Sequence, residues 1–286
     1  DMYSSSLGVS PAPASKDSLS PQNSAEPSIP KLLLNYFVCM AYEEASIRMA
    51  RELGYIKSNK DAQEFNSLYK ICERAHITEL IKKGKVSQAM EEINTNFGIE
   101  VLECDSDSGS RMNGRSLCES NTRHSSSAAS GKEDLHFKLL MLNLIEMIRS
   151  HDEDMSTAGN TGDTEESDEF VLRLISYAQE KLALKASSNR AYMAELELVM
   201  TLLLFPMYSQ TKIKKPKSLK KLYSLSLRTK IADLVNRKLL SHVHADVANI
   251  CCQDSKFPDL IGSGNCITDR QSSAFSEMLL VRPKED

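Results

Sequence analysis

Apolar residues recur at the spacing of an α-helix through most of this 286-residue chain, and this periodicity constrains the fold more than any other feature. The first example is Leu33, Tyr36, Phe37 and Met40, which follow the i, i+3, i+4, i+7 pattern of one helix face. No stretch of the sequence alternates apolar and polar residues between turn signals, as a half-buried strand would. The sequence therefore predicts an all-α fold.

Residues 31–56 predict a hairpin of two short helices. The first helix carries the stripe just described, and after a turn a second stripe follows through Tyr42, Ala45 and Met49 until Gly54. A unit of this size has too little mass to bury its own apolar face. We therefore expect the hairpin to pack on a partner protein or on a distant helix of the same chain.

Further helices are predicted on both sides of a central polar stretch. One runs from Phe65 to Lys83 and ends at Gly84, which can take the left-handed conformation of a C-cap, and a short amphipathic helix follows. The segment 135–150 is apolar around most of its circumference, which is typical of a helix enclosed by others. Two more helices are predicted over Tyr192–Phe205 and Leu222–Leu240.

Four polar or irregular segments interrupt or flank these helices. Residues 1–30 are rich in Ser, Pro and Ala, which predicts a disordered tail, and the Ser-rich residues 104–131 predict a disordered insertion. Residues 152–168 are acidic and predict a solvated linker. The structure of residues 251–286 is left open.

Charge and cysteine content narrow the class of protein. The chain has 35 Lys and Arg against 39 Asp and Glu, a net charge of −4, which disfavours nucleic acid and anionic membranes as partners. Its longest apolar run, 196–205, is too short to span a bilayer. Seven cysteines, an odd number in a chain this long, are typical of free thiols in a reducing compartment.

No catalytic, cofactor-binding or metal-binding motif is found in the sequence. The spacing of Cys and His does not fit a RING zinc site, and neither a phosphate-binding loop nor a nucleophile elbow is present. A helical enzyme using Glu146, Glu195 or a cysteine thiolate stays open as an alternative. The lysines around Pro216 predict a solvated loop, a nuclear-import signal or a site for an acidic partner.

The hairpin segment resembles the LisH motif, an aliphatic run followed by a Tyr-Leu pair, a Gly-aromatic turn, an Ala and, about four residues later, a Phe. Tyr36 and Phe37 stand for the pair, and Ala41 stands where the motif usually has Gly. Ala45 matches the motif's Ala, and Met49 replaces its usual Phe. Within residues 64–103, the stretch RAHITELIKKGKVSQAMEEIN is similar to the CTLH motif, and segments within 132–250, such as LHFKLLMLNLIEMIR and YAQEKLA, resemble the CRA region.

This order of motifs resembles the LisH-CTLH-CRA subunits of the glucose-induced degradation (GID/CTLH) E3 ubiquitin ligase, and is closest to their minimal scaffold. The resemblance implies a cytoplasmic and nuclear, non-catalytic subunit that joins substrate-receptor and RING modules for degradation of targets such as gluconeogenic enzymes. It implies SPRY-bearing, RING-bearing and receptor-docking subunits as partners, and no cofactor. The C-terminal part of the SPRY-bearing subunit stays open as an alternative.

Two sets of interaction residues follow. The expected LisH face consists of Leu33, Tyr36, Phe37, Met40, Tyr42, Ala45 and Met49. The expected CTLH-CRA residues, which serve either as interaction surface or as core, are Ile77, Ile81, Val86, Met90, Leu142, Ile145, Leu196, Leu203, Ile231 and Val235.

Overall fold

The computed structural model describes residues 29–103, 134–157, 164–205 and 216–251, and every regular element in these ranges is helical. This confirms the predicted all-α class. The predicted insertion at 104–131 lies outside the described residues, as do the predicted tails at 1–30 and 251–286 apart from their inner ends. The first helix begins at Ile29, two residues inside the predicted N-terminal tail.

The N-terminal half contains the hairpin and three further helices. Its elements are α1 (Ile29–Cys39), α2 (Glu43–Glu52), α3 (Asn59–Tyr69), α4 (Ile71–Lys82), α5 (Val86–Asn96) and the 3-10 turn η1 (Ile99–Leu102).

The C-terminal half contains one long helix at each end and shorter helices between them. Its elements are α6 (Leu135–Thr157), α7 (Thr164–Tyr177), the π-helical turn η2 (Ala178–Leu182), α8 (Ala183–Ser188), α9 (Arg190–Met200), the 3-10 turn η3 (Thr201–Leu204), α10 (Lys217–Leu222) and α11 (Ser226–Cys251).

The helix predicted from Phe65 to Lys83 is in fact two helices. Ser58 and Asp61 form a capping box that starts α3 six residues earlier than predicted. Lys70 adopts the left-handed conformation, at φ 45°, and so separates α3 from α4. The side chain of Asn66 accepts a hydrogen bond from the backbone N–H of Cys72 (3.2 Å) and so stabilises the break. The prediction was wrong because nothing local marks a lysine for a left-handed conformation.

The acidic linker predicted at 152–168 is also shorter than expected, because α6 continues to Thr157 and α7 begins at Thr164. Tertiary contacts hold the end of α6 in place. The His151 ring stacks on Phe170 of α7 with centroids 3.7 Å apart, and the Tyr223 hydroxyl donates to Asp152 Oδ2 (3.0 Å). A charge-rich sequence gives no sign of these contacts.

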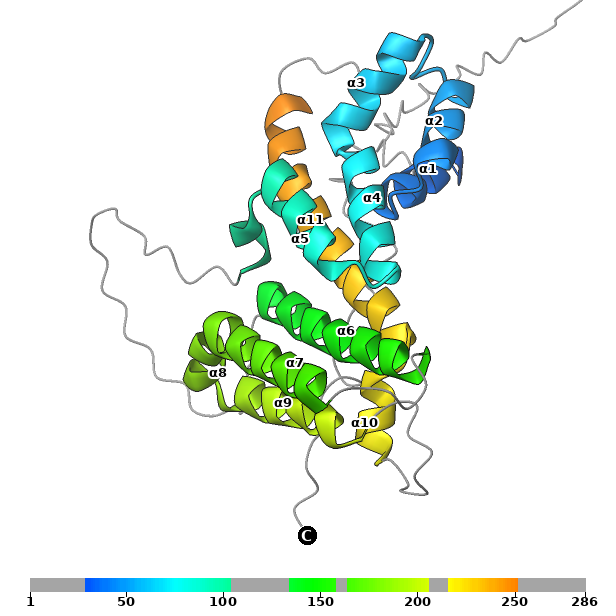
Figure 1. The fold of residues 1–286 in the computed structure, drawn as a ribbon. Helices are drawn as coiled ribbons and strands as arrows, with labels where there is room; N and C mark the ends of the chain where they lie inside the picture. The colour runs from blue at the N-terminus through cyan, green and yellow to red at the C-terminus, as the bar shows by residue number, and fades with distance from the viewer. Residues whose placement is uncertain (1–28, 104–133, 158–163, 206–215, 252–286) are drawn as a thin grey trace, which may run out of the picture.

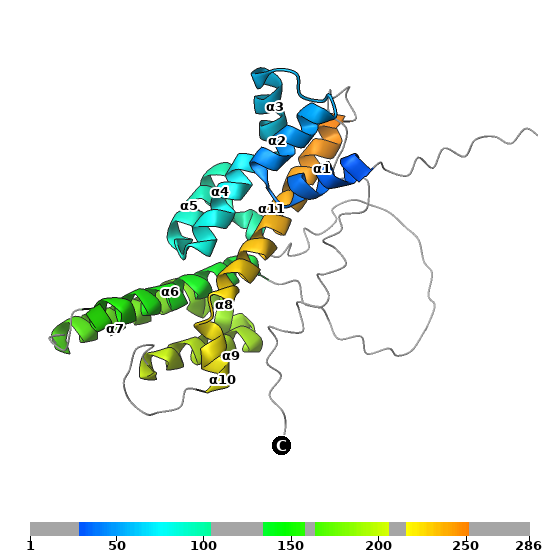
Figure 2. The same ribbon diagram turned by 90° about the vertical axis from the view of Figure 1, so that its right-hand side faces the viewer.

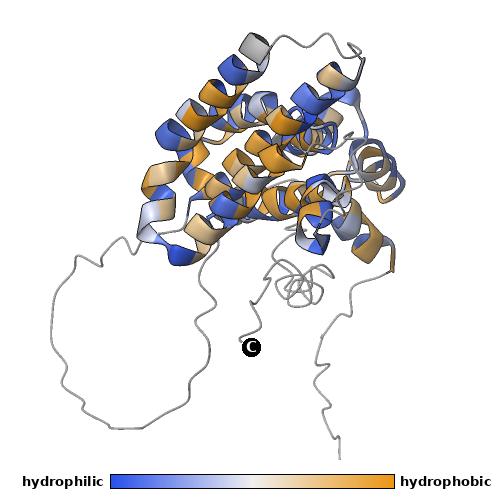
Figure 3. Ribbon diagram, turned by 60° about the horizontal axis from the view of Figure 1, so that its bottom comes forward, coloured by the Kyte–Doolittle hydropathy of each residue, from blue (hydrophilic) through white to orange (hydrophobic). Residues whose placement is uncertain are grey.

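The helix predicted over Leu222–Leu240 is α11, which begins at Ser226 and continues to Cys251, and only Leu222 belongs to the preceding short helix α10. The helices carry hydrophobic and hydrophilic residues in bands along their length, as amphipathic packing requires (Figure 3).

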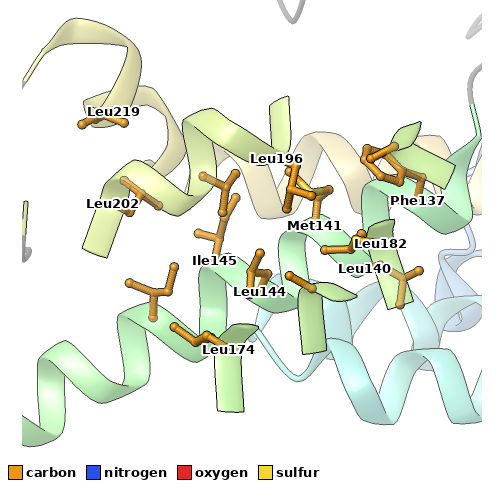
Figure 4. Close-up of a cluster of buried hydrophobic side chains, with 14 of the residues drawn as sticks. Phe137, Leu140, Met141, Leu144, Ile145, Leu174, Leu182, Leu196, Leu202 and Leu219 are labelled. Carbon is orange, nitrogen blue, oxygen red and sulfur yellow. The ribbon is translucent and has the colours of Figure 1, made fainter. Parts of the chain in front are cut away.

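Buried side chains form three clusters. The hairpin core consists of Leu34, Val38, Ala41, Ala50, Ile56, Phe65, Tyr69, Ile71 and Val243. The middle core joins α4, α5, η1, α6 and α11. The distal core joins α6 to α7, η2, α8, α9, η3 and α10, and Figure 4 shows its α6 residues, including Leu144 and Ile145, beside Leu174, Leu182 and Leu196.

Helix α11 connects the three cores. It runs almost the whole length of the molecule, from α10 at one end to α1 and α3 at the other (Figures 1 and 2). Leu227 packs at the edge of the distal core, Ile231 and Val235 lie in the middle core, and Val243 lies in the hairpin core. The hairpin therefore takes its position from the same helix that organises the rest of the fold.

Gly84, between α4 and α5, adopts φ +79°, as predicted for a left-handed C-cap. A Cβ atom there would lie 2.6 Å from Nη2 of Arg228 and 2.9 Å from Oε2 of Glu146, whereas one at Gly54 (φ +81°) would meet nothing within 4 Å. We expect Gly54→Ala to cost about 1 kcal/mol for its backbone conformation alone. Gly84→Ala should cost about 1 kcal/mol more, because it also displaces an ion pair.

Urea denaturation of the two variants beside the wild type measures this difference. Equal losses of unfolding free energy would show that the ion pair yields to the new methyl group without cost.

Candidate interaction surfaces

The N-terminal hairpin turns one face of α1 into the protein. Leu34 and Val38 are fully buried, and Ala50 of α2 is buried beside them. They pack with Phe65 and Tyr69 of α3 in the hairpin core. The hairpin therefore does pack on distant parts of its own chain, but through residues outside the predicted LisH face.

The predicted LisH face lies on the other side of the hairpin. None of its seven residues is buried: Leu33 is 41% exposed and Tyr42 is 46% exposed. Tyr36, Phe37, Met40, Ala45 and Met49 are half-buried, and Met49 packs at the edge of the hairpin core. This face is therefore still available to a partner.

Aromatic rings cluster at the turn end of this face. The centroids of Tyr36 and Phe37 are 5.9 Å apart, and Tyr42 lies 6.0 Å from Tyr36 and 6.4 Å from Phe37. Ala41 between the two helices is held at φ 57°, the left-handed conformation that suits the Gly usual in the LisH motif. The sharp turn brings Tyr42 back against the two rings of α1. The result is a partly exposed aromatic surface on a fixed backbone.

The predicted CTLH-CRA residues are mostly core. Ile145 and Leu196 are buried in the distal core, Leu203 packs against that core, and Met90 packs against both it and the middle core. The remaining predicted residues are buried in the middle core: Ile77, Ile81, Val86, Leu142, Ile231 and Val235. Of the two roles proposed for this set, the structure supports core packing.

Arg74 of α4 is the largest fully buried side chain of the described residues. Its guanidinium donates to three backbone carbonyls: Val38 (2.7 Å) and Cys39 (3.3 Å) at the end of α1, and Tyr69 (3.1 Å) at the end of α3. It thus adds a donor to carbonyls in the last turns of α1 and α3, at helix ends where a cation is favoured. Burial lowers the pKa of Arg74 to about 10, which still leaves it protonated at neutral pH.

Asn236 of α11 completes this site. Its Oδ1 accepts from Arg74 (2.9 Å), and its Nδ2 donates to the carbonyl of Cys39 (2.8 Å). One buried polar network therefore joins α1, α3, α4 and α11, and it fixes the hairpin on the helix that runs through the whole molecule.

A second network joins α6 to α11. Glu146, a candidate residue of the alternative helical enzyme, accepts from Nε and Nη2 of Arg228 (2.8 and 2.5 Å) and lies 3.4 Å from Arg149 Nε. This hydrogen bonding raises the pKa of Arg228. The carboxylate is thus held by two guanidinium groups, which is the geometry of a tie between helices.

The other candidates for catalysis that the structure describes lie in separate places, and four of the seven cysteines lie outside the described residues. Cys39 is buried next to Asn35, and the pKa of the exposed Cys72 thiol is raised by burial and by Glu43, so the reactive thiolate is disfavoured. Glu195 lies on α9, a helix of the distal core, whereas Cys39 lies on α1 and Cys72 on α4.

A polar clamp holds the two described residues that flank the 104–133 segment. Lys185 of α8 lies 3.2 Å from Glu103 Oε1 and 3.0 Å from Asp134 Oδ2. It also lies 3.1 Å from His136 Nδ1, and Asp134 in turn caps α6 through the N–H of Phe137 (3.0 Å). The chain therefore leaves and re-enters the fold at one point.

Within the described ranges, no three His, Cys, Asp or Glu residues are grouped so that they could hold a metal ion. No helix found there combines the length and the hydropathy needed to cross a membrane.

Comparison with known proteins identifies the family. The family described as "CTLH/CRA C-terminal to LisH motif domain" matches residues 70–264. The chain belongs to the CTLH/CRA family. The matched region begins at Lys70, the residue that separates α3 from α4, and the hairpin precedes it, as the family's description expects.

Named relatives agree with this family. The chain is 51% identical over 259 residues to GID complex subunit 8 of Saccharomyces cerevisiae, covering 89% of this chain and 55% of that protein. It is 29% identical over 209 residues to GID complex subunit 8 of Schizosaccharomyces pombe, covering 73% and 67%. It is 27% identical over 230 residues to Protein GID8 homolog of Arabidopsis thaliana, covering 80% and 68%.

These matches confirm the predicted resemblance to the LisH-CTLH-CRA family and to its minimal subunit. The chain spans little more than half the length of the first of these relatives.

Arg74→Met should lower the free energy of unfolding by about 3 kcal/mol or more, because it removes the four hydrogen bonds of the buried guanidinium and takes from Asn236 Oδ1 its donor. Arg74→Lys keeps the positive charge but not the planar guanidinium, so its free energy of unfolding should fall by less than that of the Met variant. Urea denaturation measures the totals. Hydrogen exchange should rise most at the end of α1, and a loss below about 1 kcal/mol for the Met variant would contradict this role.

Acid should loosen the clamp at Lys185. Burial, and then the charge of Lys185, hold the pKa of His136 below its ordinary value, so the unfolded chain binds this proton more readily than the folded one. The stabilising contribution is therefore complete above pH about 6.5 and declines as the pH falls further. The melting temperature of His136→Gln should drop less than that of the wild type between pH 7.5 and 5, and equal drops would show that His136 does not contribute.

Proposed function

We propose that this chain is a non-catalytic scaffold subunit of a GID/CTLH-type E3 ubiquitin ligase. Membership of the CTLH/CRA family and similarity to three GID subunit 8 proteins support a role as a subunit of that complex. The observation that carries the proposal is the hairpin, which buries one face in its own core and leaves an aromatic and aliphatic face accessible.

The way the hairpin is mounted favours assembly over chemistry. A flexible hairpin would lose entropy when it bound a partner, whereas the Arg74 network holds this one before binding. Aromatic side chains such as Tyr36, Phe37 and Tyr42 supply large contact areas at low entropic cost, and they are enriched in protein interfaces. The polar groups of the interior, such as Glu146 and Arg228, are engaged in ties between helices.

The proposed partners are the other LisH-CTLH-CRA subunits of the ligase, SPRY-bearing and RING-bearing, and the subunit that docks substrate receptors. In this role the chain joins substrate-receptor and RING modules for degradation of target proteins such as gluconeogenic enzymes, in the cytoplasm and nucleus. The named relatives favour the minimal subunit over the SPRY-bearing one.

Phe37→Asp with Met40→Asp should weaken assembly by tenfold or more while the chain stays folded. Both side chains are half-buried and lie outside the hairpin core, so the new charges remain hydrated in the free chain and lose water only under a partner. A loss of about 1.4 kcal/mol already gives a tenfold change in affinity. Size-exclusion chromatography with partner subunits, at concentrations near the dissociation constant, measures the effect.

Leu172→Asp with Ile175→Asp is the matched control, because it places the same charges on exposed apolar residues of α7. Circular dichroism reports folding for both variants. If the Phe37→Asp, Met40→Asp variant is folded and still elutes with its partners, the LisH face is not an assembly surface.

A further inference from the structure

A groove of about 500 Å³ lies between α4 and α5, and none of the LisH-face residues lines it. Its α4 side consists of His76, Glu79, Leu80 and Lys83, which are spaced i, i+3, i+4, i+7 and so form one stripe along the helix. Leu80 is the apolar member of this stripe and is 8% exposed. The α4 side thus offers an apolar contact between polar residues.

The other side of the groove carries the opposite charges at its two ends. Lys85 stands at the beginning of α5, and Gln88, Glu91 and Glu92 follow at i+3, i+6 and i+7. Because α4 and α5 meet in a tight turn at Gly84, Lys83 and Lys85 lie together at the turn end of the groove. Glu91 and Glu92 lie at the other end, about 10 Å along the helix from Lys85.

Much of the polar capacity of the groove is unused. Among the described residues, the side chains of His76, Lys85, Gln88 and Glu91 have no hydrogen-bond or ion-pair partner. Glu79 and Lys83 form an ion pair at 3.0 Å, but both side chains are more than half exposed. Such a pair contributes little to stability, so either side chain can turn to a new partner at low cost. The groove can therefore accept new polar contacts without breaking the fold.

We propose that this groove binds a helix of another subunit of the ligase, with a carboxylate over Lys83 and Lys85 and a basic side chain over Glu91 and Glu92. Two turns of a helix span about 10 Å, so the two charged residues of the partner are seven positions apart. A residue three or four positions from each lies on the same helix face, and an apolar side chain there packs on Leu80. The inference rests on the proposed scaffold role but uses a second surface.

Reversal of both ends of the groove tests the charge pattern. Lys85→Glu with Glu92→Lys preserves the net charge and exchanges the charges at the two ends of the groove. The control, Lys60→Glu with Glu64→Lys, makes the same exchange at exposed positions of α3 outside the groove. Each tagged chain is purified from its native cells, and the co-purified ligase subunits are quantified by mass spectrometry. With the groove variant, we expect the recovered amount of one subunit to fall at least tenfold while the amounts of the others are unchanged. With the control, we expect no subunit to fall.

A photo-crosslinking amino acid at Gln88, in the otherwise unchanged chain, identifies the occupant even where the reversed variant folds poorly. It should capture that same subunit through a helix with an acidic and a basic residue seven positions apart, and inverting those two charges should restore binding to the reversed groove. Equal recovery of all subunits with the groove and control variants, or crosslinks at Gln88 only to proteins outside the ligase, would overturn the proposal. If the Phe37→Asp, Met40→Asp variant assembles normally while the groove variant loses a subunit, the hairpin proposal fails and the groove proposal stands.

Discussion

The buried guanidinium of Arg74 is the constraint on which the arrangement of helices depends. A buried cation has to be surrounded by acceptors, and this one takes carbonyls from the ends of α1 and α3 and the amide oxygen of Asn236 on α11. These groups meet only if the hairpin, the start of the CTLH region and the last long helix pack in one way. Hydrophobic burial of Leu34 and Val38 favours the contact, and the polar network makes its geometry specific.

This specificity decides which face of the hairpin is available for assembly. The network holds the end of α1 so that Leu34 and Val38 point inward, and the stripe with Tyr36 and Phe37 is left outside. A hairpin that could rotate would bury its most apolar side and offer nothing to a partner. The same helix α11 also carries Arg228, which is tied to Glu146, so the hairpin, the middle core and the distal core share one support.

Much of this fold could be predicted from the sequence, and the failures have physical causes. Periodicity indicated the hairpin, the enclosed helix at 135–150 and the C-cap at Gly84, because these depend on local pattern. It could not choose between the two faces of α1, which is apolar on both, and it could not detect a left-handed Lys70. The partners Arg74 and Asn236 are 162 residues apart, and no local pattern joins them. The groove between α4 and α5 was missed because its residues look like ordinary solvated charges.

The clamp at Lys185 has a consequence for how such a chain can change in evolution. Glu103 and Asp134 are held at one point, so the intervening segment closes a loop whose ends are already fixed by the fold. The entropic cost of connecting two fixed points by a chain rises only slowly with the length of the chain, by about 0.6 kcal/mol for each doubling. A lineage can therefore lengthen or shorten the chain at this position, and acquire new sequence there, while the helices on either side keep their packing.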